Sequence, residues 1–370
     1  MCFVSSTIYP VLAGADIPYV GGAQVQQTLV ARELRARGYR VSVLTGDYGV
    51  SDATTADGIE LYHLPPKGNR GIKGLRLIHP RLTDIVARLR AISPDVVYAR
   101  GASGAVAACA WYARLAGRKA VFAAASDVDL LPGRIRGYRR LLDAFLYGWG
   151  VRRCDAVAVQ NLVQLKECRR RFRRTAVVIP NCYQESGYRP GVFEGPILWV
   201  GTVKSIKQPE HFLDLAARHP GRRFVMVGGP SSTSPARLEY YRTIEERARG
   251  LTNVEMTGFV PFAEVGRYFD GAAVLVNTSP AEGFPNTFLQ AWIRGVPTLS
   301  YVAPVTTDAP TATIACGSLD ALDARLAALL LATCEDWERA SAAVRRHFEA
   351  HHGVERVIPM YDQLFDAKRG

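Results

Sequence analysis

Residues 272–297 read AAVLVNTSPAEGFPNTFLQAWIRGVP, which places an apolar run, a short loop and an apolar helix in direct succession. The small and branched apolar residues at 272–276 are typical of a buried strand. Pro285 is a good first-turn residue and predicts that a helix begins there, after a loop that contains Gly283. A strand that feeds directly into a helix is the repeating unit of a parallel α/β fold.

The same alternation recurs along the whole chain. In the first half we predict strands near residues 2–6, 41–45, 96–99, 121–124, 156–160 and 176–179. In the second half we predict strands at 197–200, 223–227, 254–257, 273–277 and 298–300. Helical spacing of apolar residues predicts one helix over about 23–37, ended by Gly38, and another over about 354–367. Two halves of this kind predict two doubly wound domains with a ligand cleft at the carboxyl ends of their strands.

The length of 370 residues also favours two domains, because one hydrophobic core rarely organises so long a chain. Residues 181–195 are rich in Pro, Gly and polar side chains and are interpreted as the linker. We therefore predict domains at 1–182 and 193–352, followed by a C-terminal helical segment at 353–370. Seven scattered cysteines without a Cys-x-x-Cys pair argue against a zinc site and a disulfide framework.

The net charge of +12 is unusual, and much of it lies between residues 134 and 174. Twelve basic residues fall there, at positions 134, 136, 139, 140, 152, 153, 166, 169, 170, 171, 173 and 174. Such a surface attracts polyanions, including anionic lipid, but a solvated helix face explains it equally well. The apolar residues interleaved at 141–149 fit either a membrane-surface helix or a buried helix face.

The sequence also bears on where in the cell the protein resides and on whether it binds nucleic acid. No apolar run reaches the ~18–20 residues that span a bilayer, and the start MCFVSSTIYP lacks the features of a signal peptide. We therefore expect a cytoplasmic protein, with peripheral contact to the inner face of the cell membrane as an option left open by the basic segment. Charge without a recognition module gives no support for nucleic-acid binding.

Glu282 is the first candidate for chemistry, because it lies on the loop between the predicted strand and helix of 272–297. Backbone amides around Gly283, Phe284, Asn286 and Thr287 would favour a phosphate at the helix N-terminus, and Gln290 follows at a distance suited to the same ligand. Without further context, a glutamate before a helix is ordinary N-terminal helix chemistry.

Two other segments carry candidate ligand contacts. In WVGTVKSIKQPEHFLDLA, residues 199–216, a predicted strand ends at Gly201 and a loop carries Lys204 and Lys207, which can reach a diphosphate. Gly21 and Gly22 precede the first long helix and allow close backbone approach to an anion. Taken alone, the lysines fit an ordinary surface loop, and the glycines fit a structural turn.

The order and spacing of these segments resemble family 4 of the retaining glycosyltransferases, which have the GT-B fold. The resemblance covers nearly the whole chain, through GGAQVQQTLVARELRARGYRVSVLTGDYG, DAVAVQN, VVIPN, WVGTVKSIKQPEHFLDLA, VMVGGP, TGFVPFAEV and PAEGFPNTFLQAW. It implies two Rossmann-like domains facing a central cleft, with the C-terminal helix crossing back to the first domain. The first domain would serve the acceptor, and the second would bind a nucleotide sugar.

The resemblance also implies roles for individual residues. Glu282 matches the first glutamate of the family's Glu-x7-Glu motif, which contacts hydroxyls of the donor sugar, and Gln290 stands where the second would bind the ribose. Lys207 matches the basic residue that neutralises the diphosphate, and Gly22 the glycine that closes over it. Further donor contacts are implied for residues around these, namely Gly201, Thr202, Lys204, Phe259, Val260, Gly283, Phe284, Asn286 and Thr287.

Three residues depart from the family pattern. Thr202 replaces an arginine, for which Lys204 is a partial substitute, and Gln290 lacks the charge of glutamate. Ser126 stands where a first-domain histidine is common, and a serine cannot replace its charge or general-base function. We place Ser126, Asp127 and Asp129 on the acceptor side. We assign no metal to the Asp-x-Asp sequence, because two carboxylates alone make a poor site for a hard cation.

The implied activity is a metal-independent, retaining hexosyltransferase that uses a nucleoside-diphosphate sugar as donor and needs no further cofactor. The acceptor would be a hydroxyl group, lipid-linked if the basic segment contacts a membrane, as in the assembly of polysaccharides, glycolipids or other glycoconjugates. Two alternatives stay open: a binding or partner subunit of this fold that has lost turnover, and a nucleotide-sugar epimerase. The resemblance does not specify the sugar, the nucleotide or the acceptor.

Overall fold

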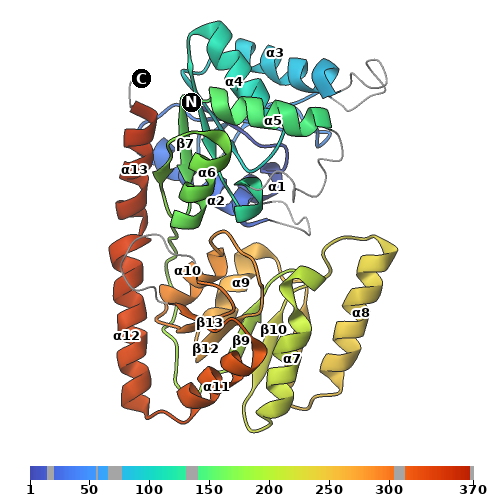
Figure 1. Ribbon diagram of the computed structural model, residues 1–370, viewed down its shortest axis with the longest axis vertical. Helices are drawn as coiled ribbons and strands as arrows, with labels where there is room; N and C mark the ends of the chain where they lie inside the picture. The colour runs from blue at the N-terminus through green and yellow to red at the C-terminus, as the bar shows by residue number, and fades with distance from the viewer. Residues whose placement is uncertain (15–20, 56, 66–76, 131–140, 304–312, 367–370) are drawn as a thin grey trace. The chain divides into compact units, whose positions relative to one another are not determined.

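A computed structural model of the protein describes residues 1–14, 21–55, 57–65, 77–130, 141–303 and 313–366 (Figure 1). Contacts within the chain divide it into two compact units. The described part of the first unit runs to Asn181 and includes the chain from Val354 onward, and that of the second is Cys182–Gly353. Four arginines of the basic segment, at positions 134, 136, 139 and 140, lie outside the described residues.

The first unit is an eight-stranded sheet in the order β3-β4-β2-β1-β5-β6-β7-β8. Its strands are β1 Cys2–Val4, β2 Ser42–Thr45, β3 Ala53–Thr54, β4 Glu60–His63, β5 Val96–Arg100, β6 Lys119–Ala123, β7 Ala156–Val159 and β8 Val177–Val178. All pairs are parallel except β3 with β4. Its helices are α1 Tyr9–Leu12, α2 Gly22–Ala36, α3 Thr83–Ile92, α4 Ala105–Ala116, α5 Leu141–Arg153, α6 Leu162–Phe172 and α13 Val354–Asp366, with short helical segments at Leu77–Leu82 and Asp127–Leu130. The central strands β1, β2 and β6 are buried along their length, as in a parallel sheet covered on both faces.

The second unit is a fully parallel six-stranded sheet in the order β11-β10-β9-β12-β13-β14. Its strands are β9 Ile197–Val200, β10 Phe224–Val227, β11 Val254–Gly258, β12 Val274–Asn277, β13 Thr298–Ser300 and β14 Thr313–Ala315. Its helices are α7 Pro209–Arg218, α8 Pro235–Arg249, α9 Phe262–Phe269, α10 Asn286–Trp292, α11 Leu319–Leu330 and α12 Cys334–His351, with a helical turn at Ser205–Lys207. The chain order reverses between β9 and β12, which are adjacent central strands, and ligands of doubly wound sheets bind at such a reversal.

The last helix, α13, packs with the first sheet. The Lys119 ammonium, at the start of β6, donates to the carbonyls of Leu364 (2.7 Å) and Phe365 (3.1 Å) near the end of α13. Arg100, at the end of β5, donates to the Tyr361 hydroxyl over 3.2 Å. The helical conformation is interrupted at residues 352–353, between α12 and α13. The C-terminal stretch therefore contributes one helix to each unit.

The prediction of two Rossmann-like domains with parallel sheets is confirmed. The helix predicted over 23–37 is α2, and Gly38 follows it with φ +91°, a value that favours glycine at a helix end. The sequence analysis missed β3, β4 and β14, which have two to four residues each. In the described residues, none of the seven cysteines forms a disulfide, and no helix is both long enough and apolar enough to span a bilayer.

Candidate active site

Lys207 and Glu282 meet at the carboxyl ends of the two central strands of the second unit. Lys207 ends the helical turn after β9, and Glu282 lies on the loop after β12. Lys207 Nζ donates to Glu282 Oε1 over 2.8 Å, and the two side chains are 21% and 18% exposed. The Thr278 hydroxyl donates to the Lys207 carbonyl over 2.6 Å, which fixes one loop to the other. The sequence prediction placed both residues at one site, and the structure brings them into direct contact.

The charge of Glu282 is maintained by this pairing. Burial acts to raise the pKa of its carboxyl group, but the charge and hydrogen bond of Lys207, together with Ser279 and Lys204, hold the pKa below its usual value. Lys204 lies three residues before Lys207, and burial together with the charge of Lys207 lowers the pKa of its ammonium group. Two lysines and one carboxylate therefore leave this end of the sheet with an excess of positive charge.

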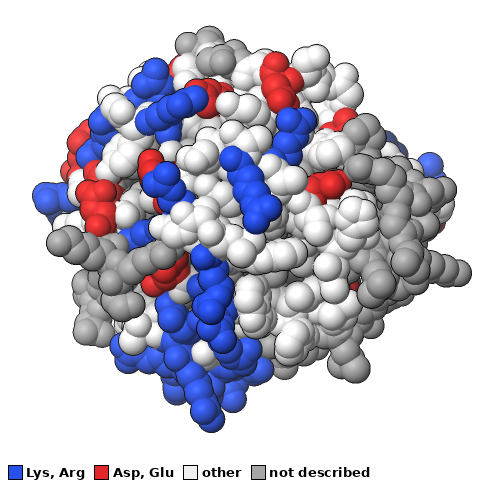
Figure 2. Space-filling view, turned by 90° about the horizontal axis from the view of Figure 1, so that it is seen from above, with Lys and Arg blue, Asp and Glu red and all other residues white. Residues whose placement is uncertain are grey.

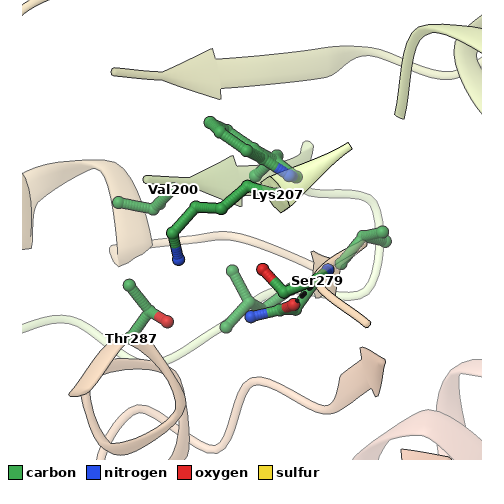
Figure 3. Close-up of a pocket in the computed structure, with 8 residues that line it drawn as sticks. Val200, Lys207, Ser279 and Thr287 are labelled. Carbon is green, nitrogen blue, oxygen red and sulfur yellow. Dashed lines mark hydrogen bonds between the residues drawn. The ribbon is translucent and has the colours of Figure 1, made fainter. Parts of the chain in front are cut away.

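A narrow pocket, too small in this structure to hold a water molecule, lies beside Lys207 (Figure 3). Lys207 and Thr287 point into it from opposite walls, and Val200 and Ser279 complete the labelled lining. The Ser279 amide donates to Asn277 Oδ1 over 2.8 Å, which holds the start of the Glu282 loop. Donors and a cation thus converge on a pocket at the point where the strand order reverses.

Glycines let the surrounding loops approach one another. Gly201 follows β9, and Gly228, with φ +159°, follows β10. A Cβ atom at Gly228 would overlap the carbonyl of Gly201, so a larger residue would displace the loop that carries Thr202 and Lys204. Thr202 is partly buried in this loop.

The predicted base-lining residues follow β11. Phe259 comes directly after Gly258, whose φ is +71°, and its side chain is 45% exposed. Gly229 approaches the backbone of Phe259 closely. Val260 packs at the edge of a hydrophobic cluster in the same unit, so Phe259 is the more available of the two for stacking.

The loop and helix after Glu282 divide into buried and partly buried residues. Phe284 is 5% exposed and packs its ring against Trp292, with ring centroids 5.9 Å apart, so only its backbone is available to a ligand. Gly283 is buried, whereas Asn286 and Thr287 at the start of α10 are partly exposed. Gln290 is 3% exposed, and its Nε2 donates to the Tyr183 hydroxyl at a long 3.5 Å.

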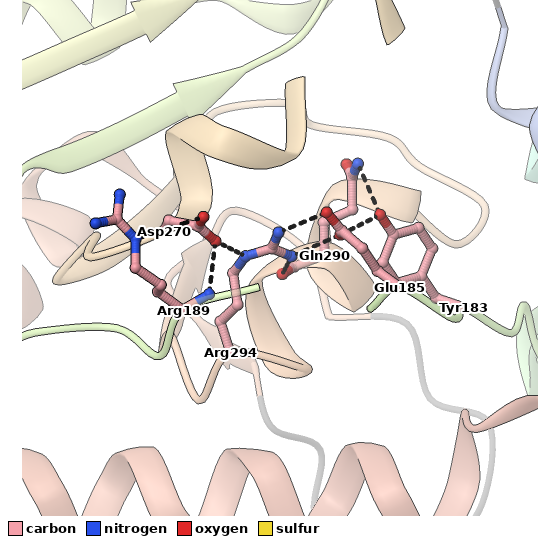
Figure 4. Close-up of polar contacts among 6 residues, drawn as sticks. All are labelled: Tyr183, Glu185, Arg189, Asp270, Gln290 and Arg294. Carbon is pink, nitrogen blue, oxygen red and sulfur yellow. Dashed lines mark hydrogen bonds and ion pairs between the residues drawn. The ribbon is translucent and has the colours of Figure 1, made fainter. Parts of the chain in front are cut away.

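The sequence analysis missed a buried ionic network centred on Arg294, which follows α10 (Figure 4). The Arg294 guanidinium donates to both carboxylate oxygens of Glu185 (2.8 and 2.9 Å), to Asp270 Oδ1 (2.7 Å) and to the Gln290 carbonyl (3.0 Å). Its side chain is 1% exposed. The available signal was an arginine in an otherwise apolar helix end, together with Glu185 in the segment interpreted as linker and Asp270 just before the strand predicted at 273–277.

The candidates of the first unit lie in and beside the short helical segment Asp127–Leu130 and at the start of α2. Asp129 is 9% exposed, and its carboxylate accepts from the amides of Ala125 (2.7 Å), Ser126 (3.0 Å) and Ala102 (3.2 Å). Asp127 Oδ1 accepts from Gln164 (2.8 Å) and Asn161 (3.1 Å). Both carboxylates therefore organise the loop after β6, and Asp129 does so from inside it.

Ser126 and Gly22 are the remaining predicted positions. The Ser126 hydroxyl accepts weakly from the Val128 amide over 3.4 Å, and its residue is partly exposed. Gly22 is the first residue of α2. Within the described residues, no group of three or more His, Cys, Asp or Glu side chains is arranged to hold a metal ion.

Two Rossmann-like domains with parallel sheets are the architecture of the GT-B class. Two family models match most of the chain: one described as a glycosyl transferase 4-like domain matches residues 21–182, and one described as glycosyl transferases group 1 matches residues 195–331. The protein belongs to the GT4-type glycosyltransferases. A comparison with curated proteins gives no significant match.

Solved structures share the fold over almost the full length. Sucrose-phosphate synthase from Thermosynechococcus elongatus is 16% identical with a TM-score of 0.77, covering 99% of this chain and 98% of that one. Anabaena Alr3699/HepE in complex with UDP and glucose is 15% identical with a TM-score of 0.71, covering 98% of each chain. The lipopolysaccharide outer core galactosyltransferase WaaB is 14% identical with a TM-score of 0.64, again covering 98% of each.

Proposed function

We propose that this protein transfers a sugar from a nucleoside-diphosphate sugar to a hydroxyl acceptor with retention of anomeric configuration. The observation that carries the proposal is the Lys207–Glu282 pair beside the pocket at the strand reversal. A diphosphate leaving group needs fixed positive charge, and a donor sugar needs hydrogen-bond acceptors for its hydroxyls. Lys207 and Glu282 supply one of each within 2.8 Å of one another.

The proposed division of roles follows from the charges. Lys207, supported by Lys204, stabilises the negative charge that grows on the departing diphosphate, and Lys204 takes over part of the function of the arginine that Thr202 replaces. Glu282, held ionised by Lys207, accepts hydrogen bonds from sugar hydroxyls. Electrostatic groups of this kind act best when they are fixed before the reaction, and the Thr278 hydrogen bond fixes the Lys207 loop. The acceptor proton leaves with a diphosphate oxygen, so the proposal requires no strong protein base.

We further propose that the reaction needs no metal ion. The one Asp-x-Asp sequence has its carboxylates engaged by backbone amides and side-chain amides of the first unit, which supports a structural use of Asp127 and Asp129. A hard cation would have to displace these hydrogen bonds and find further oxygen ligands.

For the basic segment, residues 134–174, we propose contact with an anionic membrane at which the acceptor is presented. Figure 2 shows Lys and Arg gathered densely in one part of the surface, with Asp and Glu scattered elsewhere. On and after α6, the basic residues Lys166, Arg169, Arg170 and Arg173 are exposed. Glu167 pairs with Arg170 (2.7 Å) and Arg171 (2.8 Å), which reduces the charge available to a lipid surface. In α5, Tyr147 and Val151 are buried in the core and Leu146 and Trp149 pack against it, whereas Phe145 is 66% exposed.

A binding screen tests the donor proposal first. Thermal unfolding is followed with UDP, GDP and ADP and with their sugars, because a ligand at 100 times its dissociation constant stabilises a protein by about 2.7 kcal/mol. We expect one nucleoside diphosphate to raise the unfolding temperature and its sugar to be turned over. Binding without turnover would favour the alternative of a partner subunit, and conversion of the sugar without its release would favour an epimerase.

A further inference from the structure

The side chain of Gln290 faces a phenol whose single proton already has a partner. The Tyr183 hydroxyl donates to Glu185 Oε2 over 2.6 Å, and Gln290 Nε2 donates to the same hydroxyl oxygen over 3.5 Å (Figure 4). A phenol has one O–H to donate and lone pairs with which to accept. Position 290 therefore faces an acceptor, which suits the NH₂ of an amide and does not suit an ionised carboxylate.

The ionic network holds the Tyr183 proton on the Glu185 side. Arg294 binds both oxygens of Glu185 and also Asp270, so the Glu185 carboxylate is fixed in place and is a strong acceptor. Burial and the hydrogen bond to Glu185 raise the pKa of the Tyr183 hydroxyl, so Tyr183 keeps its proton.

The backbone holds both ends of the Gln290–Tyr183 contact. The Tyr183 amide donates to the His352 carbonyl over 3.1 Å, and residue 183 pairs with Gly353 in an isolated parallel bridge. On the other side, Arg294 donates to the Gln290 carbonyl over 3.0 Å from one turn further along the chain. Both residues of the contact are therefore anchored through their backbones.

We propose that Tyr183 is a positioning residue that orients Gln290 and makes glutamine, not glutamate, the suitable residue at this position. Because Nε2 is engaged by Tyr183, Oε1 is the atom that accepts hydrogen bonds from the ribose hydroxyls of the nucleotide donor. This inference rests on the proposed function, since it takes residue 290 to contact the donor. It explains why glutamine stands at position 290, where the family pattern has glutamate, as a consequence of the Tyr183–Glu185 pair.

The inference and a simple reading of the family pattern give opposite results for Gln290→Glu. If glutamate were the better ribose ligand, the variant would bind the nucleotide more tightly. If Tyr183 requires an amide, a carboxylate at 290 faces the Tyr183 oxygen and the Glu185 charge without a proton between them, and binding weakens. Hydrogen bonds to charged groups are worth enough that we expect a loss of about tenfold or more.

The experiment measures the affinities of wild type, Gln290→Glu, Tyr183→Phe and the double variant by titration calorimetry. The probe is whichever of UDP, GDP and ADP binds wild type, together with its 2′,3′-dideoxy analogue. We expect both single variants to weaken binding of the ribonucleotide and to leave the dideoxy analogue nearly unchanged. In the Tyr183→Phe background, Gln290→Glu should cost less, because the phenol oxygen is gone.

Each outcome decides the matter. Equal or tighter binding by Gln290→Glu, or equal losses for ribonucleotide and dideoxy analogue, would overturn the inference and leave the proposed function standing. Absence of binding of all three nucleoside diphosphates to wild type would overturn the proposed function and the inference with it. If Gln290→Glu does not fold, as its thermal unfolding would show, Tyr183→Phe with the two nucleotides gives the same decision.

Discussion

The ion pair of Lys207 and Glu282 is the residue-scale basis of the proposed activity, because each side chain determines the state of the other. Without Lys207, burial would raise the pKa of the Glu282 carboxyl, and without Glu282 two lysines would lie close together without their carboxylate. Such a pair is poised for a ligand that carries both a diphosphate and hydroxyl groups.

Replacement of Lys207 by alanine should weaken binding of a nucleoside diphosphate by about 10- to 100-fold, the value of a charge-assisted hydrogen bond. Binding of the matching nucleoside should change little, because it has no phosphate. Calorimetric titration with both ligands measures the difference, and Lys166→Ala, an exposed lysine of the other unit, is the matched control. Equal losses for both ligands would mean that Lys207 does not face the diphosphate.

Replacement of Glu282 by alanine should abolish transfer and leave the fold intact, because the side chain is 18% exposed, pairs with Lys207 and belongs to no hydrophobic core cluster. Release of nucleoside diphosphate from the donor sugar measures activity, and thermal unfolding measures the fold. Activity near that of wild type would remove Glu282 from the site.

The same residues show what the sequence could and could not specify. Lys207 and Glu282 were placed at one site by the resemblance to the family motifs. The structure adds that each follows a strand of one parallel sheet, whose strands end at the same edge. The network of Arg294 with Glu185 and Asp270 was not predicted, because its three members are far apart in sequence and only the folded chain brings them together.

At the scale of elements, strand and helix order was predictable wherever apolar runs are long. Strands β3, β4 and β14 were missed because they have only two to four residues each, too few for an apolar run to stand out. The segment at 181–195 was interpreted as linker from its composition, yet it is anchored in the second unit: the amide of Gly191 donates to the Arg294 carbonyl over 2.9 Å. Composition indicates irregular backbone but does not show what that backbone contacts.

Attachment of α13 to the first sheet depends on Lys119. Burial lowers the pKa of its ammonium group. This group donates hydrogen bonds to two carbonyls near the end of the helix. Lys119→Met should lower the free energy of unfolding by about 1–3 kcal/mol, because the carbonyls lose a charged donor. Chemical denaturation followed by circular dichroism measures the change, with Lys166→Met as control. A loss no greater than that of the control would show that α13 is held by its apolar contacts alone.

At the scale of the whole molecule, the proposal of a metal-independent reaction predicts that transfer survives EDTA. Both carboxylates of the Asp-x-Asp sequence already have hydrogen-bond donors. Transfer is measured with and without the chelator, after which Mn²⁺ or Mg²⁺ is added back. Loss of activity with EDTA and recovery with either ion would contradict the proposal.

The basic surface predicts binding to acidic vesicles and not to neutral ones. Each basic residue near an anionic surface contributes about 1 kcal/mol, and 1 M salt reduces the screening length to about 3 Å. The triple change of Lys166, Arg169 and Arg173 to glutamate should release the protein from vesicles. It should leave transfer to a water-soluble acceptor intact.

The control for that experiment carries the same charge change on the second unit, at the exposed residues Arg242, Arg249 and Arg339. Vesicle sedimentation compares the two triple variants. Equal release by both, or sedimentation that does not depend on lipid charge, would leave the basic segment as a solvated helix face.

The most direct test of the central claim is the product of the reaction. The sugar nucleotide selected by the binding screen is incubated with a panel of hydroxyl acceptors, including short alcohols, and the glycoside is examined by proton NMR. We predict a glycoside with the anomeric configuration of the donor from wild type and none from Glu282→Ala. An inverted product, or an equal yield from the variant, would contradict the account.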